Sequence, residues 1–87
     1  MNVESAIRER LAVLAPESLA ISDDSALHAG HVGAAGGGGH YHLTIVSNQF
    51  SGCSRVARHR MVYAALGEMM QTDIHALAIE ARAPNES

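Results

Sequence analysis

Residues 54–81 read SRVARHRMVYAALGEMMQTDIHALAIEA, a helix-like segment that runs into a strand-like one. The hydroxyl of Ser54 can accept an amide hydrogen bond from a first helical turn, so Ser54 is the expected N-cap. A helix is predicted over residues 56–70, with a break near Arg58. Four side chains of one parity then predict a strand over residues 75–81 and are expected to face the core: His75, Leu77, Ile79 and Ala81.

The elements before this stretch follow from the same periodicities. Apolar residues recur every three or four positions from Val3 to Leu14, which predicts a helix over residues 3–14 that Pro16 ends. Leu19 and Ile21 indicate a short strand before the turn formers at 23–25. Alternation over residues 41–46 indicates a second strand, which we expect to pair antiparallel with the first.

This order of helix, strand, strand, helix, helix, strand requires a crossover before the last strand. A crossover joins parallel strands, so we expect a three-stranded mixed sheet with the helices on one face, an α/β fold of the α+β sandwich type. The 87 residues allow one domain over 1–87, with order over about 3–82 and a frayed tail over 83–87. Six of the eight glycines lie between positions 27 and 40, which predicts a mobile glycine and histidine loop over 28–40.

Charge and cysteine content narrow the function classes. A formal charge of −3 gives no overall attraction to nucleic acid, so any such role would need a local basic patch. The single cysteine, Cys53, excludes an intrachain disulfide and suits a reducing compartment. No apolar run has the length of a membrane span or of a signal peptide. We therefore expect a soluble, cytoplasmic protein that does not bind a membrane.

Six histidines are a high count for this length, and four of them lie in or beside the glycine loop: His28, His31, His40 and His42. Imidazole is a common ligand of zinc, copper and iron, so the loop is a candidate metal site. Solvated loop histidines are the alternative, because no cysteine pair or carboxylate completes a tetrahedral set. For His75 the alternative is a histidine at the core edge whose ring bonds to backbone.

Several short motifs together resemble the BolA family over about residues 3–82. They are Asp24-Ser25, Ile45-Val46-Ser47, the F-S-G-C-S turn at 50–54, Arg58-His59-Arg60 and Ile74-His75-Ala76-Leu77. Each tripeptide is weak alone, and their joint spacing makes the match specific. The resemblance implies a type II KH-like fold of order α-β-β-α-α-β.

The resemblance also implies a partner and ligands. In the BolA family, a histidine at the start of the last strand binds an iron–sulfur cluster shared with a monothiol glutaredoxin and its glutathione. That histidine corresponds to His75. The second family ligand lies in the loop between the first two strands. His28 matches it through Asp24-Ser25, and His31 is its rival. The cluster would have two irons and two sulfides, in cluster trafficking or in iron and redox regulation, with no cofactor on the isolated chain. A weak homodimer is a further expectation.

A basic cluster supports a second hypothesis from another class. The residues Arg55, Arg58, His59 and Arg60 lie around the entry to the predicted helix and could meet phosphates, as in a DNA-binding transcriptional regulator. A solvated helix face, or binding to a partner's carboxylates, is the alternative. The G-x-x-G loop of nucleic-acid-binding KH domains is missing between residues 54 and 66.

No catalytic set is evident. Ser54, His59 and Asp73 could be written as a hydrolase triad, but no nucleophile-elbow glycine pattern surrounds any serine. We therefore expect a protein that is not an enzyme.

Overall fold

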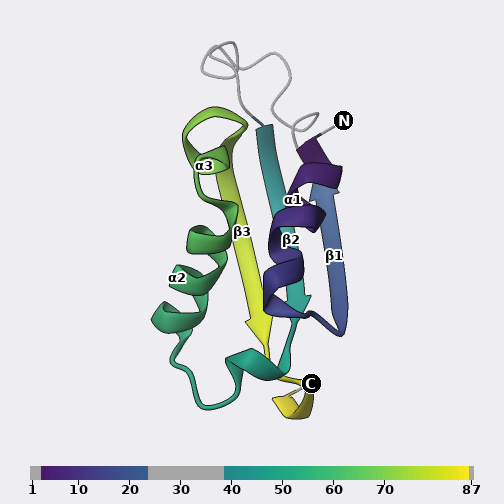
Figure 1. Cartoon of the computed structure of the whole chain (residues 1–87), viewed down its shortest axis with the longest axis vertical. Helices are drawn as coiled ribbons and strands as arrows, with labels where there is room; N and C mark the ends of the chain where they lie inside the picture. The colour runs from purple at the N-terminus through teal and green to yellow at the C-terminus, as the bar shows by residue number, and fades with distance from the viewer. Residues whose placement is uncertain (1–2, 24–38, 87) are drawn as a thin grey trace.

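The computed structural model describes residues 3–23 and 39–86, which form one sheet covered by helices on one face (Figure 1). The first helical segment comprises α1 (Val3–Leu11) and the 3-10 turn η1 (Ala12–Leu14), so the predicted helix over 3–14 is confirmed. It ends where Ala15 takes a left-handed conformation, with φ 47° and ψ 56°, just before Pro16. This helix packs on α2 and on the sheet.

The sheet has the order β1-β2-β3. β1 (Ser18–Asp23) pairs antiparallel with β2 (Gly39–Val46), and β2 pairs parallel with β3 (Ile74–Arg82). The predicted mixed sheet is therefore confirmed. His40 lies within β2 and not in the glycine loop, and the remainder of the predicted loop, residues 28–38, lies outside the described residues.

The segment between β2 and β3 holds the short turn η4 (Asn48–Phe50) and the helices α2 (Arg55–Leu66) and α3 (Met69–Thr72). Ser54 caps α2 as predicted, because its Oγ accepts a hydrogen bond of 3.1 Å from the amide of Ala57. The break between helices was predicted near Arg58, and this is wrong. It lies at Gly67, whose φ of 56° and ψ of −126° end α2.

Apolar side chains from the helices, the sheet and η4 form one core. Its fully buried members are Ile7, Leu11, Leu43, Ile45, Phe50, Val62 and Leu66. Ser47 is the buried polar residue among those described; its Oγ donates to the carbonyl of Leu14 at 2.6 Å and accepts from the amide of Gln49 at 3.1 Å. This hydroxyl ties the end of the first helical segment to the turn after β2.

The prediction that the tail frays is wrong for the part that the structure describes. Ala83 is buried, and the 3-10 turn η5 (Pro84–Glu86) follows it. The carboxylate of Glu86 accepts a hydrogen bond from the amide of Ala83 at 3.1 Å and also binds Arg58. Side-chain pairing therefore extends the order to residue 86.

Candidate functional site

The first residues of β3 contain a β-bulge. Gly39 pairs with Ile74, while the next residue, His40, pairs with Ala76, so His75 is the extra residue on β3. An extra residue breaks the strict alternation of side chains. Ile74, Leu77 and Ile79 all lie toward the core, whereas His75 is exposed. The expectation that His75 faces the core with Leu77 is therefore wrong, and so is its alternative as a histidine at the core edge.

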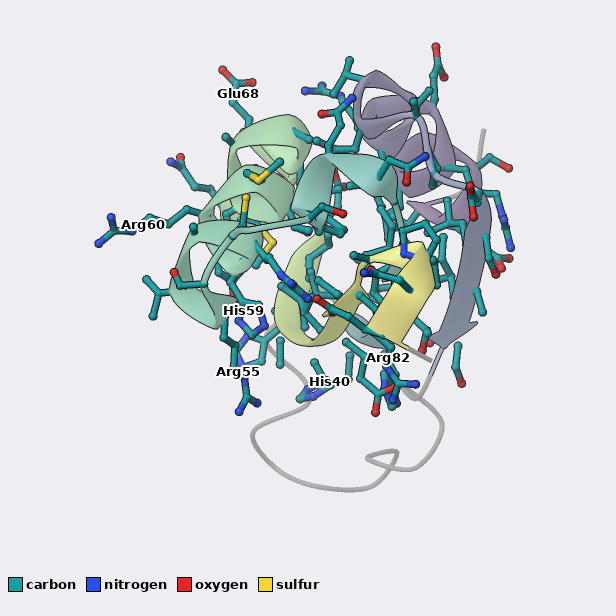
Figure 2. All side chains as sticks on the ribbon, turned by 90° about the horizontal axis from the view of Figure 1, so that it is seen from below. His40, Arg55, His59, Arg60, Glu68 and Arg82 are labelled. Atoms are coloured by element: carbon teal, nitrogen blue, oxygen red, sulfur yellow. The ribbon has the colours of Figure 1, made fainter. Side chains whose placement is uncertain are left out.

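The bulge brings His75 beside His40 of β2. The two ring centroids are 5.2 Å apart and the ring planes are inclined by 46°. His40 alternates with the core residues Tyr41 and Leu43, so it lies on the sheet face that the helices leave open, as Figure 2 shows. Sequence reasoning placed His40 in the glycine loop, and so missed this neighbour of His75.

Gly39 fixes the backbone at this point. A Cβ on Gly39 would lie only 2.4 Å from the Cε2 atom of Tyr41, so the Tyr41 ring occupies the space that a side chain would need. Burial, followed by the charges of Asp23, Asp73 and Glu4, raises the pKa of Tyr41. The phenol therefore stays neutral and packs as part of the core, on the face of the sheet opposite to His40.

His42 lies on the same open face as His40 but has different neighbours. Its Nε2 is 3.9 Å from Oε1 of Glu80. The carboxylate of Glu80 also accepts from Thr44 Oγ1 at 3.5 Å and lies 3.7 Å from Nη2 of Arg82. His42 thus belongs to a polar network farther along the sheet.

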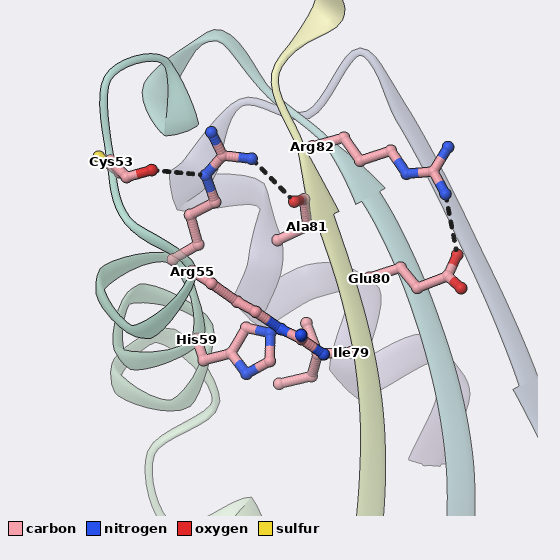
Figure 3. A pocket seen from close by; sticks show the side chains of 8 residues that line it. Cys53, Arg55, His59, Ile79, Glu80, Ala81 and Arg82 are labelled. Carbon is pink, nitrogen blue, oxygen red and sulfur yellow. Dashed lines mark hydrogen bonds and ion pairs between the residues drawn. The ribbon is translucent and has the colours of Figure 1, made fainter. Parts of the chain in front are cut away.

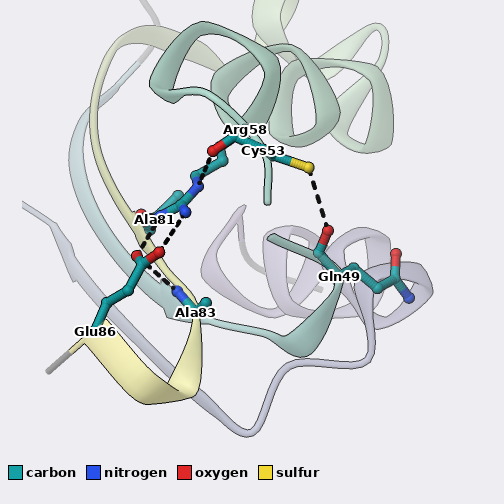
Figure 4. Close-up of polar contacts among 6 residues, drawn as sticks. All are labelled: Gln49, Cys53, Arg58, Ala81, Ala83 and Glu86. Carbon is teal, nitrogen blue, oxygen red and sulfur yellow. Dashed lines mark hydrogen bonds and ion pairs between the residues drawn. The ribbon is translucent and has the colours of Figure 1, made fainter. Parts of the chain in front are cut away.

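Arg58, a candidate for nucleic-acid contact, binds other parts of the chain through its guanidinium. Its Nε donates to the carbonyl of Cys53 at 3.0 Å, its Nη1 donates to the carbonyl of Ala81 at 3.1 Å, and the guanidinium binds both carboxylate oxygens of Glu86 (Figure 4). Its side chain is only 12% exposed. The hydrogen bond from Arg58, with that from the Ala83 amide, lowers the pKa of Glu86 to about 2. Arg58 is therefore not available to a phosphate while this arrangement holds.

The basic residues of α2 divide between two sides of the helix. Successive residues of a helix are turned by about 100°, so neighbours in sequence point apart. Arg55, Arg58 and His59 line a pocket of about 420 Å³ between α2 and β3 (Figure 3), whose wall on β3 is formed by residues 79–82. Arg60 points away from the sheet, as seen in Figure 2. Three members of the predicted basic cluster thus line one pocket, and Arg60 lies apart from them.

Ser54 and Asp73, two members of the hydrolase triad considered above, lie at opposite ends of the segment that carries α2 and α3. Ser54 caps α2, and Asp73 Oδ2 accepts from Thr72 Oγ1 at 3.2 Å. Over residues 3–23 and 39–86, no group of three or more His, Cys, Asp or Glu side chains is arranged to hold a metal ion. A metal bound at this end of the sheet would therefore need further ligands from another source.

Comparison with known proteins assigns this chain to a family. The model of the family described as BolA-like protein matches residues 11–86. The chain belongs to the BolA family. The BolA-like protein 1 of Homo sapiens is 43% identical to it over 83 residues, and the chloroplastic protein BOLA1 of Arabidopsis thaliana is 43% identical over 90 residues.

Solved BolA structures share the fold. BolA1 from Arabidopsis thaliana superposes with a TM-score of 0.84 at 40% identity, and each chain covers nearly all of the other, 100% of this one and 98% of that one. The α+β architecture with a three-stranded mixed sheet is thus that of BolA proteins, the type II KH-like fold. The match to the human relative covers 94% of this chain and 58% of the relative, and that to the Arabidopsis one 99% and 56%.

His28, the loop ligand expected in this BolA protein, and its rival His31 lie outside the described residues. No helix within residues 3–23 and 39–86 is long and apolar enough to span a membrane. Of the predicted ligands, the structure thus describes His75.

Proposed function

We propose that this BolA protein binds a monothiol glutaredoxin and shares a two-iron two-sulfur cluster with it, acting in cluster trafficking or in iron and redox regulation. His75 is the ligand at the centre of the proposal. The observation that carries it is the bulge, which exposes the His75 imidazole at one end of a sheet face that has no helix over it.

The donor chemistry fits a shared cluster. One iron of such a cluster accepts two imidazoles in place of two thiolates, and the other iron then keeps thiolate ligands. The described part of this chain presents imidazoles at the bulge, while Cys53 lies in the turn before α2, at the far end of β3 from His75. The thiolates would come from the glutaredoxin cysteine and its bound glutathione. Imidazole ligation reduces the negative charge of the cluster and raises its potential, which suits sensing and transfer.

The surface around His75 also favours approach by a partner. The residues that follow His75 on the open face of β3, Ala76 and Ala78, are small and exposed. Along β3, a partner can therefore come close to the imidazole without meeting long side chains. The proposed role is binding and not catalysis, in the reducing environment of the cytoplasm.

The test is anaerobic co-purification with a monothiol glutaredoxin and glutathione, followed by visible absorption and circular dichroism. The wild type is compared with His75→Ala, with His28→Ala and His31→Ala, and with His59→Ala as a control on α2. We expect a heterodimer whose cluster spectrum differs from that of the glutaredoxin alone and reverts in His75→Ala. A spectrum that is the same for wild type and His75→Ala would rule the proposal out.

DNA binding is the second candidate, and it would rest on Arg55 and Arg60, which are exposed on α2. Changing both to alanine should flatten the salt dependence of any DNA affinity by about one unit of slope for each phosphate that is no longer neutralised. The same double variant should leave the cluster spectrum unchanged. The two candidates are thus separated by one pair of measurements.

A further inference from the structure

The pocket between α2 and β3 carries more positive than negative charge. Its lining holds three arginines and a histidine against one carboxylate, that of Glu80. Two of the arginines already have acidic neighbours, because Arg58 binds Glu86 and Arg82 lies 3.7 Å from Glu80. Arg55 has no ion pair or hydrogen bond with any other described residue. Its charge is therefore open to an acid from outside this part of the chain.

A second cationic group accompanies Arg55 on the same face of α2. Arg55 and His59 are four residues apart, which places them one turn apart on one side of the helix. Figure 3 shows both side chains reaching from α2 across the pocket toward Ile79. His59 also lacks an acidic partner among residues 3–23 and 39–86. When the imidazole is protonated the two groups repel each other, so an anion bound beside both would be favoured.

The wall on β3 is an edge of the sheet, because β3 is the last strand in the order β1-β2-β3. The carbonyl of Arg82 accepts from the Ser47 amide, on the side of β2. The carbonyl of Ala81 accepts from Arg58, on the side of α2. Carbonyls alternate between the two sides of a strand, so Ile79 also presents its N–H and C=O toward α2. No hydrogen bond from the described residues reaches these two groups.

The C-terminal turn shows how a carboxylate is held beside this edge. The carboxylate of Glu86 binds the guanidinium of Arg58 and accepts from the backbone amide of Ala83 at the same time. A guanidinium on α2 and a backbone amide after or within β3 thus hold one acid together. Arg55 and Ile79 offer the same two kinds of group, and the described residues place no acid between them.

We propose that the pocket between α2 and β3 is a docking site for an extended acidic segment of a protein partner. The segment pairs its backbone with Ile79, as a strand added to a sheet edge, and places a carboxylate on Arg55 beside His59. The volume of about 420 Å³ is within the roughly 300–1,000 Å³ of pockets that enclose small ligands, so it admits a few peptide residues. The site does not include His75, and it does not rest on the proposed cluster binding.

A nucleic acid fits this pocket less well than a peptide. Phosphates supply acceptors only, whereas the carbonyl of Ile79 needs a donor. Glu80 stands in the wall and repels a continuous row of phosphates. Arg60, another exposed arginine of α2, points away from the pocket in Figure 2, so the basic side chains do not follow one track.

The test begins with a random library of seven-residue peptides displayed on phage, which is selected on the isolated full chain. We expect enrichment of peptides with two or more Asp or Glu residues. The most enriched peptide is synthesised, and its dissociation constant is measured by fluorescence anisotropy. The constant should rise about tenfold in Arg55→Ala, the loss of about one hydrogen bond between charged groups, and should not change in Arg60→Ala. Arg60→Ala is the matched control, because it removes the same charge from the other side of the same helix.

Two further measurements locate the bound peptide. Amide NMR shifts on titration should gather at residues 79–82 and in the first turns of α2, and the same spectra confirm that each variant is folded. The backbone amides of the peptide are then methylated one at a time. Methylation of at least one of them should weaken binding about tenfold, because it removes the donor that pairs with the Ile79 carbonyl.

The remaining outcomes would overturn the proposal. They are selection without enrichment of acidic peptides, equal affinities of Arg55→Ala and Arg60→Ala, and shifts that gather elsewhere on the chain. A single strand of seven thymidines is the competing probe. If it displaces the peptide and depends equally on Arg55 and Arg60, the pocket serves nucleic-acid binding and the peptide site is wrong. The cluster spectrum enters none of these measurements, so the proposed function is tested separately.

Discussion

The guanidinium of Arg58 joins three parts of the chain that are distant in sequence. It binds the turn before α2 through Cys53, the last strand through Ala81, and the C-terminal turn through Glu86. Sequence reasoning assigned this arginine to nucleic-acid contact because it stands in a run of basic residues. Its partner Glu86 is 28 positions away, and no local pattern indicates that pairing.

The pairing predicts a dependence of stability on pH. The pKa of Glu86 falls from an ordinary value of 4.5 to about 2 in the folded chain, so the unfolded chain binds a proton first as pH falls. The stabilisation is therefore complete above about pH 4.5 and is lost as the pH falls toward 2. Glu86→Gln should lower the thermal midpoint at pH 7, and its difference from the wild type should shrink below pH 4.5.

Thermal unfolding followed by circular dichroism at several pH values checks this. The control is Glu68→Gln. Glu68 is exposed, and Figure 2 shows it on the opposite side of the molecule from Arg82, the last residue of β3. It should follow the wild type at every pH. If the difference in thermal midpoint between Glu86→Gln and the wild type stayed constant down to pH 2, the charge of the Glu86 carboxylate would not be the source of the stabilisation.

Ser47 and Ser54 each cap a helical turn, and substituting them predicts different losses of stability. Ser54 is exposed and caps α2, so Ser54→Ala should cost about 1 kcal/mol. Ser47 is buried, and Ser47→Ala would leave the Gln49 amide without its acceptor and the Leu14 carbonyl without its donor, at a cost of about 1–3 kcal/mol. Urea denaturation of both variants gives the order. Equal losses would mean that water replaces the Ser47 hydroxyl. The cap was predictable because it is local, whereas the partner of Ser47 lies 33 positions away.

Among the elements, the junction of α2 and α3 is set by one backbone conformation. Gly67 has φ 56° and ψ −126°, which residues with a Cβ rarely adopt, and an added Cβ would also approach Arg10 Nη1 to 3.3 Å. Gly67→Ala should therefore cost about 1–3 kcal/mol of unfolding free energy.

The opposite change at Ala15 should have the opposite sign. Ala15 holds a left-handed conformation that costs a residue with a side chain about 1–2 kcal/mol. Glycine removes that cost and adds about 0.5–1 kcal/mol of chain entropy loss, so Ala15→Gly should stabilise by up to about 1.5 kcal/mol. Denaturant midpoints of the two variants test both signs. If both variants shifted the denaturant midpoint in the same direction, packing and not backbone conformation would determine the stability effect at these two positions.

Strand β3 shows how far the side-chain orientation of a strand can be predicted from its sequence. Strict alternation describes Leu77, Ile79 and Ala81 correctly. It fails at His75, because one bulged residue reverses the faces of everything before it. Ile74 is apolar and out of phase with Leu77, and this is the signal that would have indicated the bulge. For the same reason the candidate site at the start of β3 was predicted only in part, because His75 was named and its neighbour His40 was not.

At the scale of the whole molecule, stability rests on one small core. Phe50 is the single phenylalanine of the chain and is fully buried. Phe50→Ala should cost about 3–5 kcal/mol, a large part of the roughly 5–15 kcal/mol that holds a typical domain. Thermal unfolding should show a strongly lowered midpoint or no cooperative transition. Val13→Ala, at a residue that is 70% exposed, should change little, and a similar loss there would contradict this view of the core.

The element order sufficed to predict the mixed sheet, because a crossover segment leaves few arrangements for the last strand. It did not predict that residues 83–86 would be ordered, since their order depends on Arg58 and on the burial of Ala83. Local periodicity thus predicts the layers of the molecule. The position of its C-terminal turn depends instead on side-chain pairing between residues that are far apart in the sequence.

The parallel pairing of β2 with β3 also governs when the histidine pair can exist. During synthesis His40 emerges long before His75, and the two rings meet only after α2 and α3 have crossed over and the last strand has docked on β2. A nascent or truncated chain that ends before β3 carries most of the histidines but cannot present this pair. The proposed cluster binding through His75 therefore has to wait until the last strand has docked.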